Sequence, residues 1–383
     1  MKKMLSLAAM FAALSYAAPA SAALNIGGDA AIRLRNESYS GTSSNINRDA
    51  NDLKWQYRVR LNGAADLGNG YYFKAMITDE SEKAGGWNTM SGSETYDLQL
   101  SNFYFGRNLE NCRYALGRLP LGAFNNPIFD ITLYPFQPLE NPVATANMDR
   151  IFGISYGTKF LSGDLRANLV VLDNASKNNT GAEADGKFND GYAIHIAYTD
   201  KIGNVTIEPQ FIRAITHGPV SGYSSNYTAP LYPAVTPWTA GANVTIPAGD
   251  LKIGLGGYYT HGKNSTATSV VIGGIGYPLS AGKADYHGYE FRVKAEYGNF
   301  MCFYDYNRTT DKTPGNVNTG AADGKYTNNF VWAQYKIPVH QSAAGTVTIQ
   351  PTLRYLANKA SGNAWQEVNQ QRLRTELWAT VTF

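Results

Sequence analysis

The sequence predicts an all-β fold, a transmembrane antiparallel up-and-down β-barrel of about 16 strands whose long third loop folds into the lumen. Three observations lead to this prediction. Short segments alternate between apolar and polar side chains along the chain, which is the period of a strand with one apolar and one wet face. No run after residue 22 reaches the ~18–20 apolar residues that a membrane-spanning helix needs. Short turns and long polar connections follow each other between the segments.

Residues 1–22 have the layout of a secretory signal peptide. Lys2 and Lys3 precede an apolar run from Met4 to Ala18, and Ala20-Ser21-Ala22 gives an A-x-A cleavage site. The alternative is a retained amphipathic helix. We expect two parts, a signal peptide at 1–22 and a single barrel domain at 23–383.

Each predicted strand carries apolar residues on one face and polar residues on the other. Residues 289–297 show the pattern most clearly, whereas the phase of 96–106 stays open because Phe103 and Tyr104 compete for the inward face. In chain order the strands are 24–37, 53–67, 71–80, 96–106, 114–118, 152–160, 165–171, 192–198, 205–215, 238–246, 251–259, 289–297, 300–308, 329–337, 347–355 and 370–383.

The long connections all fall at one end of this predicted barrel, and the short turns fall at the other. A soluble β-sandwich, the alternative fold, gives no reason for the asymmetry, whereas membrane barrels have short periplasmic turns and long outer loops. Closure would also pair the last strand with the first and leave no open edge. The long connections are 38–51, 81–95, 119–148, 174–188, 216–237, 263–285, 310–326 and 358–368.

Cysteine spacing and charge exclude several function classes. Cys112 and Cys302 match no metal or redox spacing, and the strand order puts them on opposite sides of the barrel, so we expect no intramolecular disulfide. The formal charge is +3, and it falls to +1 without Lys2 and Lys3 of the predicted signal peptide. A chain so close to neutral gives no reason to expect a nucleic-acid partner. The five histidines are scattered, and neither H-E-x-x-H nor G-x-S-x-G occurs. No enzymatic activity, cofactor or metal site is therefore predicted.

The chain resembles the general porins of Gram-negative outer membranes. The resemblance rests on the signal peptide, the first strand directly after it, the strand number, the terminal Phe383, and the segment 114–119 followed by a thirty-residue loop and a new strand at 150–156. The Pro-Glu-Phe-Gly-Gly string of enterobacterial members is absent from that loop. The resemblance implies a homotrimer in outer-membrane lipid, inserted by the barrel-assembly machinery through Phe383. It also implies a water-filled channel for passive diffusion of small hydrophilic solutes and ions.

The loop 119–148 differs from the other long connections because it is apolar and holds five prolines. Packing inside the barrel would explain this composition, since a long loop is otherwise functional or disordered. An external lid or a trimer-contact loop is the alternative. The acidic residues in or beside this loop are Asp130, Glu140 and Asp149.

Arginines on the inward faces of the first, second and last strands predict a basic pore wall opposite these acids. Such an arrangement would set ion selectivity, and Arg suits phosphate or carboxylate. Alternatively, Asp29, Glu37, Asp66 and Glu376 neutralise the arginines. The predicted wall comprises Arg33, Arg35, Arg58, Arg60, Arg118, Arg372 and Arg374.

Two other functions stay open at this stage. One is a substrate-specific sugar or anion channel, for which about 18 strands are the alternative to 16; the predicted inward aromatics Tyr72, Phe103 and Tyr258 are too few to indicate a sugar path. The other is a non-conducting barrel adhesin or enzyme.

Small outward residues on the first, second and last strands predict where subunits would meet. Small side chains let neighbouring elements approach closely, as in membrane helix packing. We therefore expect the trimer to form through the first strand and its neighbours. These residues are Gly28, Ala30, Gly63, Ala65 and Ala379.

Overall fold

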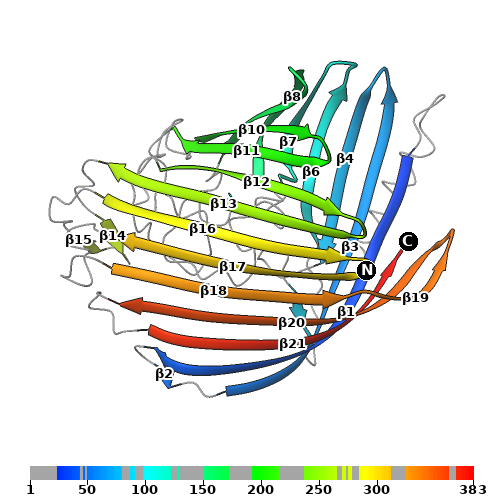
Figure 1. The fold of residues 1–383 in the computed structure, drawn as a ribbon. Helices are drawn as coiled ribbons and strands as arrows, with labels where there is room; N and C mark the ends of the chain where they lie inside the picture. Colours follow the sequence, from blue (N-terminus) through cyan, green and yellow to red (C-terminus); the bar gives the residue numbers. More distant parts are fainter. Residues whose placement is uncertain are drawn as a thin grey trace.

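A closed antiparallel barrel of 16 strands with up-and-down topology forms the molecule, as predicted (Figure 1). Within the described residues, no helix is long and apolar enough to cross a membrane. The computed structural model of the 383-residue chain describes residues 24–43, 46–47, 50–79, 87–90, 98–121, 128, 151–171, 192–215, 237–264, 270–272, 275–277, 284–311, 324–361 and 368–383. The predicted signal peptide lies outside these ranges.

Every predicted strand has a counterpart in the wall. The first half of the wall is β1 (Leu24–Ser43), β3 (Ala50–Gly68), β4 (Tyr71–Asp79), β6 (Gln99–Asn108), β7 (Cys112–Leu119), β8 (Ile151–Phe160), β9 (Gly163–Val171) and β10 (Tyr192–Ile202). The second half is β11 (Val205–Ala214), β12 (Trp238–Ala248), β13 (Leu251–Asn264), β16 (Ala284–Tyr297), β17 (Phe300–Asp311), β18 (Gly324–Tyr335) continued by β19 (Ile337–Ser342), β20 (Gly345–Ser361) and β21 (Val368–Thr382). Short additional strands are β2 (Ile46–Asn47), β5 (Asn88–Thr89), β14 (Val270–Ile272) and β15 (Ile275–Tyr277).

The barrel closes where β1 pairs with both β3 and β21. At the end of this seam, the backbone N–H of Gly28 donates to the carbonyl of Phe383 at 2.8 Å, and that of Phe383 donates back at 3.1 Å. Gly28 lies so close to β3 that a Cβ atom there would sit 2.4 Å from the carbonyl oxygen of Arg60. The predicted pairing of the last strand with the first is confirmed, and the beginning of β1 lies at the same end of the barrel as Phe383.

That end also carries the short turns. Residues 69–70, 161–162, 203–204, 249–250, 298–299 and 343–344 each reverse the chain between neighbouring strands. Asn69 adopts φ = 52° between Gly68 and Gly70, a left-handed conformation that Asn tolerates better than most residues. The long predicted connections join strands at the opposite end, and most of their residues lie outside the described ranges.

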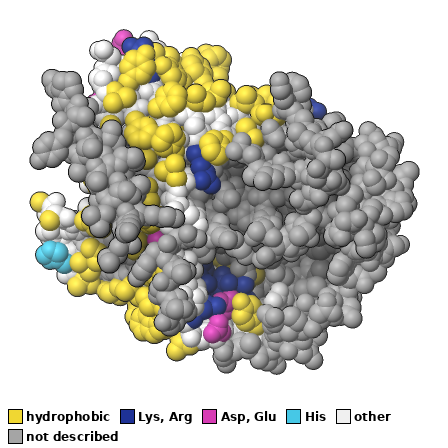
Figure 2. All heavy atoms as spheres, turned by 180° about the vertical axis from the view of Figure 1, so that it is seen from behind, with side chains coloured by type: hydrophobic (Ala, Val, Ile, Leu, Met, Phe, Trp, Pro, Cys, Tyr) yellow, Lys and Arg dark blue, Asp and Glu magenta, His cyan; other side chains and the backbone are white. Residues whose placement is uncertain are grey.

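The two faces of the wall have opposite chemistry. Leu53, Trp55, Phe291, Val293 and Tyr297 are each more than half exposed on the outer face, and hydrophobic side chains spread over the described strands in the space-filling view (Figure 2). The inner face buries many charged and amide side chains. This is the reverse of a soluble protein and fits a wall with lipid outside.

Two local predictions are settled by the strand register. Phe103 is wrong as an inward residue, because it is exposed and packs against Phe73 on the outer face, whereas Tyr104 meets Tyr72 edge-on. Cys112 on β7 and Cys302 on β17 are free thiols. Their strands pair with β6 and β8, and with β16 and β18, so the two cysteines lie on separate parts of the wall.

Candidate functional site

Two buried glutamates organise a cluster of cations on the inner face of β20, β21, β1 and β3. Alternation along β1 and β21 brings their charged side chains to the same face. The register places Arg35 opposite Glu376 and Glu37 opposite Arg374, and opposite charges in such positions attract each other across strands. Glu37 and Glu376 are 1% and 5% exposed.

Glu376 holds three guanidinium groups. Its Oε1 lies 2.5 Å from Arg35 Nε and 3.3 Å from Arg33 Nη1, and its Oε2 lies 3.0 Å from Arg354 Nη2. The indole Nε1 of Trp378 also donates to Oε2 at 3.0 Å. Charged hydrogen bonds of this kind are stronger than neutral ones, so one carboxylate on β21 fixes three cations from two strands, β1 and β20.

Glu37 forms the second centre. Arg374 donates to its Oε1 from Nε at 2.8 Å and approaches it with Nη2 at 2.6 Å. Arg372 and Lys54 lie 3.5 and 3.7 Å from this carboxylate, and the Tyr39 hydroxyl donates to it. Arg35, at 3.9 Å from Glu37, links the two centres.

The wall keeps a positive excess despite these glutamates. Five arginines share the two carboxylates: Arg33, Arg35, Arg354, Arg372 and Arg374. Lys54 lies 3.7 Å from Glu37 and 2.9 Å from a third carboxylate, that of Asp52. The predicted neutralising acids therefore exist but are outnumbered.

Of the other predicted acids, Asp29 lies 3.7 Å from Arg58. Asp66 is not part of the cluster, because it accepts the backbone N–H of Gly68 at the turn.

Most predicted wall residues are brought together, but Arg118 is not. Arg58 and Arg60 lie on β3 beside the cluster, opposite Ala31 and Asp29 in the register. Arg118 is instead the register partner of Phe103 and Phe152, both exposed on the outer face. Its guanidinium lies 5.8 Å from the Phe152 ring. Its assignment to the pore wall was wrong, since it rested on its position before the loop rather than on strand alternation.

Aromatic side chains that were not predicted stack on the arginines. Trp87 lies 4.2 Å from the Arg33 guanidinium and 4.8 Å from that of Arg58. Arg354 lies 3.7 Å from the Trp332 ring, and Trp87 meets Trp378 at 5.0 Å. Cation–π contacts are worth more when the cation is desolvated, so these rings hold the guanidinium groups in place.

The sequence contained a signal for one of these residues. The alternation of Leu353 and Tyr355 in the predicted strand 347–355 puts Arg354 on the inner face. Trp87 carries no such signal, because it follows Gly85 and Gly86 in a long connection. It reaches the wall because β5, directly after it, pairs with β3 beyond the end of β4.

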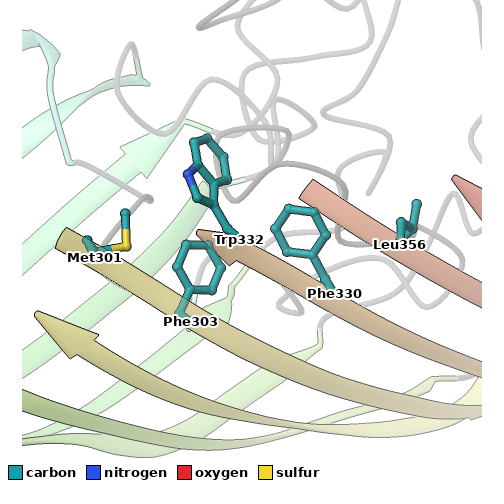
Figure 3. Close-up of a cluster of buried hydrophobic side chains, with 5 residues drawn as sticks. All are labelled: Met301, Phe303, Phe330, Trp332 and Leu356. Carbon is teal, nitrogen blue, oxygen red and sulfur yellow. The ribbon is translucent and has the colours of Figure 1, made fainter. Parts of the chain in front are cut away.

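An apolar cluster continues the inner wall beyond Arg354, contrary to the polar face expected there. Its side chains point to the same side of β17, β18 and β20 (Figure 3). Phe303 stacks on Trp332 at 5.8 Å, and Trp378 packs against the cluster from the basic side. The cluster consists of Met301, Phe303, Phe330, Trp332 and Leu356.

The predicted acidic residues Asp130, Glu140 and Asp149 lie outside the described residues. Of their loop, Leu119, Pro120, Leu121 and Ile128 are described. Leu119 and Ile128 are 2% and 0% exposed, whereas Pro120 is exposed. In the described part of the chain, no group of three or more His, Cys, Asp or Glu side chains could hold a metal ion.

The Gram-negative porin family matches residues 6–360 of the chain. No curated protein matches it. An anion-selective porin from Comamonas acidovorans has a similar fold, with TM-score 0.54 and 13% identity over 95% of this chain and 100% of that one. OmpF of Salmonella typhi in complex with daunomycin has a TM-score of 0.54 and 9% identity over 94% of this chain and 97% of that one. OmpT of Vibrio cholerae, in trimer form, has a TM-score of 0.51 and 9% identity over 95% of this chain and 100% of that one.

We expect Glu376→Gln to destabilise the barrel by about 3–5 kcal/mol, because it leaves buried guanidinium groups without their counter-ion. The matched control is Glu296→Gln, whose partners Lys252 and Lys294 are more exposed, and it should cost less than about 1 kcal/mol. Urea unfolding followed by tryptophan fluorescence measures both. Equal losses would contradict the central role of Glu376.

Proposed function

Because the chain belongs to the Gram-negative porin family, it is an outer-membrane diffusion channel, and we propose that its basic inner wall makes the channel prefer anions. Family and fold indicate a channel rather than an enzyme. The observation that carries the proposal is the sharing of two carboxylates by five arginines on one side of the barrel. Charges of one sign along a pore raise the local concentration of counter-ions.

The cations divide into two layers with different roles. The side chains of Arg33 and Arg354 are only 3% and 4% exposed, so they act through their field. Those of Lys54, Arg58 and Arg372 retain 27%, 15% and 11% exposure, so they can meet a passing ion. Small carboxylates and phosphates suit these donors.

We further propose that the loop 119–148 narrows the channel, with Asp130, Glu140 and Asp149 facing the basic wall. Two observations support this. The described Ile128 is completely buried, and the inner wall offers an apolar surface at Met301, Phe303, Phe330, Trp332 and Leu356. An apolar loop in a water-filled channel needs such a surface to exclude water from its side chains.

Reversal potentials in a salt gradient test the basic wall. Arg58→Glu combined with Arg372→Glu should shift the anion-to-cation permeability ratio toward cations by about fivefold or more, since one charge near an ion is worth on the order of 1 kcal/mol in water. Arg213→Glu combined with Arg308→Glu makes the same charge change on the outer face and should leave the ratio unaltered. An unshifted double variant would refute the wall, and current saturating with one solute would instead indicate a substrate-specific channel.

Thiol labelling tests the loop in planar bilayers. Cys112 and Cys302 are first replaced by Ser, and Cys is introduced at Asp130 or Glu140. A bulky charged methanethiosulfonate should then lower single-channel conductance, because it occupies the narrow part of the pore. The control is Ser265→Cys in the long connection 263–285. Equal responses at control and loop positions would place the loop outside the channel.

We propose a homotrimer that meets through the outer faces of β1, β3 and β21. Gly28, Ala30 and Ala379 leave room there, and Leu53 and Trp55 offer exposed apolar surface. Ala379→Arg should reduce the trimer to monomers in detergent, as measured by light scattering, whereas Val293→Arg on β16 should not. Since both variants place a charge on the outer face, the pair separates assembly from barrel stability. A wild-type chain that is monomeric when folded would exclude the trimer.

A further inference from the structure

The inner face of the barrel has a hollow of about 210 Å³ where β12, β13 and β16 run side by side. We propose that this hollow binds inorganic phosphate inside the channel. The proposal rests on the function proposed above only for the route by which the anion arrives, because the hollow is not part of the basic wall. Its walls are the side chains of Asn243, Thr245, Lys252, Arg292, Lys294 and Glu296.

The hollow faces the lumen at the short-turn end of the barrel. Leu255 is 41% exposed on the outer face, so alternation turns its neighbours Gly254 and Gly256 inward. Gly256 lies six residues beyond the turn at 249–250, which at ~3.3 Å per residue keeps the hollow within roughly 20 Å of that turn. The apolar cluster on β17, β18 and β20 separates it from the basic wall.

Two inward glycines on β13, Gly254 and Gly256, make the floor of the hollow. A Cβ atom at Gly254 would meet Lys294 Cβ at 3.4 Å, an ordinary contact, so strand pairing does not require a glycine there. Glycine weakens the interior of a strand and often marks a place where a ligand approaches the backbone. The missing side chains therefore leave room for a ligand rather than for a neighbouring strand.

Two lysines give the hollow a positive rim. Lys294 Nζ lies 2.7 Å from Glu296 Oε1, and Lys252 Nζ lies 3.2 Å from Glu296 Oε2. One carboxylate therefore serves two ammonium groups, which leaves one positive charge in excess at the rim. The side chain of Lys252 is more than half exposed, so it can turn toward an anion in the hollow.

Arg292 is a fixed donor on the same side of the hollow. It donates to Asp305 from Nε at 2.5 Å and from Nη2 at 2.6 Å. The Phe303 ring lies 4.6 Å from its guanidinium group. A guanidinium held in this way presents N–H groups in a constant direction, which suits the oxygens of a phosphate.

The positions of the charges, rather than their sum, favour an anion. Glu290, Asp305 and Glu208 nearly cancel the positive charge around the hollow. Among the described residues, however, the lining holds three cations and one carboxylate, and these three acids do not belong to it. An anion in the hollow thus meets N–H donors at short range and most acids at longer range. Binding is weak as a result, as it must be for a solute that leaves the channel again.

Volume limits the ligand to a small anion. The hollow is smaller than the ~300–1,000 Å³ sites that take drug-sized ligands, and at ~30 Å³ per water it holds about seven waters. Phosphate can replace several of these waters, and its oxygens accept hydrogen bonds from several donors at once. Asn243 and Thr245 add neutral polar groups from β12.

Block of the chloride current by phosphate tests the proposal in planar bilayers. The folded full-length protein conducts chloride while inorganic phosphate is added at constant ionic strength. Phosphate in the hollow obstructs the neighbouring lumen, so conductance should fall and then level off, with half of the effect at about 1–10 mM. A conductance that changes in proportion to phosphate without levelling off would overturn the proposal, and this result requires no variant.

Gly254→Leu fills the hollow without changing its charge. The half-blocking phosphate concentration should rise at least about tenfold, because the ligand loses its place beside charged donors. The matched control is Gly257→Leu on the same strand. A Cβ atom there would lie 3.6 Å from the Phe291 ring on the outer face, and the block should stay unaltered. Equal effects of the two variants would assign the change to the strand and contradict the hollow.

Lys252→Gln combined with Lys294→Gln should also raise the half-blocking concentration at least about tenfold, because two charged donors are lost. Arg113→Gln combined with Lys159→Gln is the matched control. These two cations also share one carboxylate, that of Asp164, on the inner face at the same end of the barrel. The control should change the block by less than about twofold, since salt screens distant charges. An equal loss in both pairs would show that phosphate responds to the general field and not to the hollow.

Reversal potentials separate this proposal from the anion preference of the channel. Gly254→Leu should leave the reversal potential unaltered, because it changes no charge. Anion preference without a saturating block would refute the hollow alone. A saturating block that depends on Gly254, in a channel without anion preference, would refute the basic wall alone.

Discussion

The hydrogen-bonded seam between β1 and β21 is the interaction on which the rest of the structure depends. In a lipid environment, an open strand edge leaves backbone N–H and C=O groups without partners, and each costs several kcal/mol. Two backbone hydrogen bonds between Gly28 and Phe383 complete the pairing of the first and last strands, so neither strand is left with an open edge there. The absence of a side chain at Gly28 lets β1 approach β3 on its other side. A closed ladder, rather than an apolar core, therefore holds this molecule together.

Closure also creates the basic wall. Glu37 and Arg374 are 337 residues apart in the chain, and they meet only because the first and last strands are neighbours. The same holds for Arg35 and Glu376. Each glutamate lowers the repulsion among arginines that would otherwise oppose closure. The charge pattern at the two ends of the chain thus supports both the seam and the wall that we propose for permeation, so a change to either glutamate should affect both.

Strand alternation was sufficient to predict which arginines of the first and last strands face inward, but not which side chains surround them. The inward positions of Arg33, Arg35, Arg372 and Arg374 follow from period two along uninterrupted strands. Alternation also predicts that Arg354 faces inward, because Leu353 and Tyr355 on either side of it belong to the apolar outer face.

The remaining differences have physical causes. In the strand 96–106, the adjacent aromatics Phe103 and Tyr104 are equally good candidates for the outer face. Only the hydrogen-bonded pairing with the neighbouring strands decides which of them faces outward. Trp87 reaches the wall because β5 pairs with β3. This pairing lies in a long connection without alternating side chains, so the sequence pattern does not predict it. The apolar cluster around Phe330 breaks the rule that an inner face is polar: its side chains are buried, and a buried surface need not be wet.

The stacking of Trp87 and Trp332 on arginines has a kinetic consequence. A guanidinium group fixed between a ring and a carboxylate cannot swing toward an ion and follow it through the pore. It contributes a stationary potential and no tight complex. In the anion-preferring channel proposed above, an anion would gain attraction along a stretch of wall without losing its water shell at any one point. Such a channel would exchange anions rapidly and sort them by charge more than by shape.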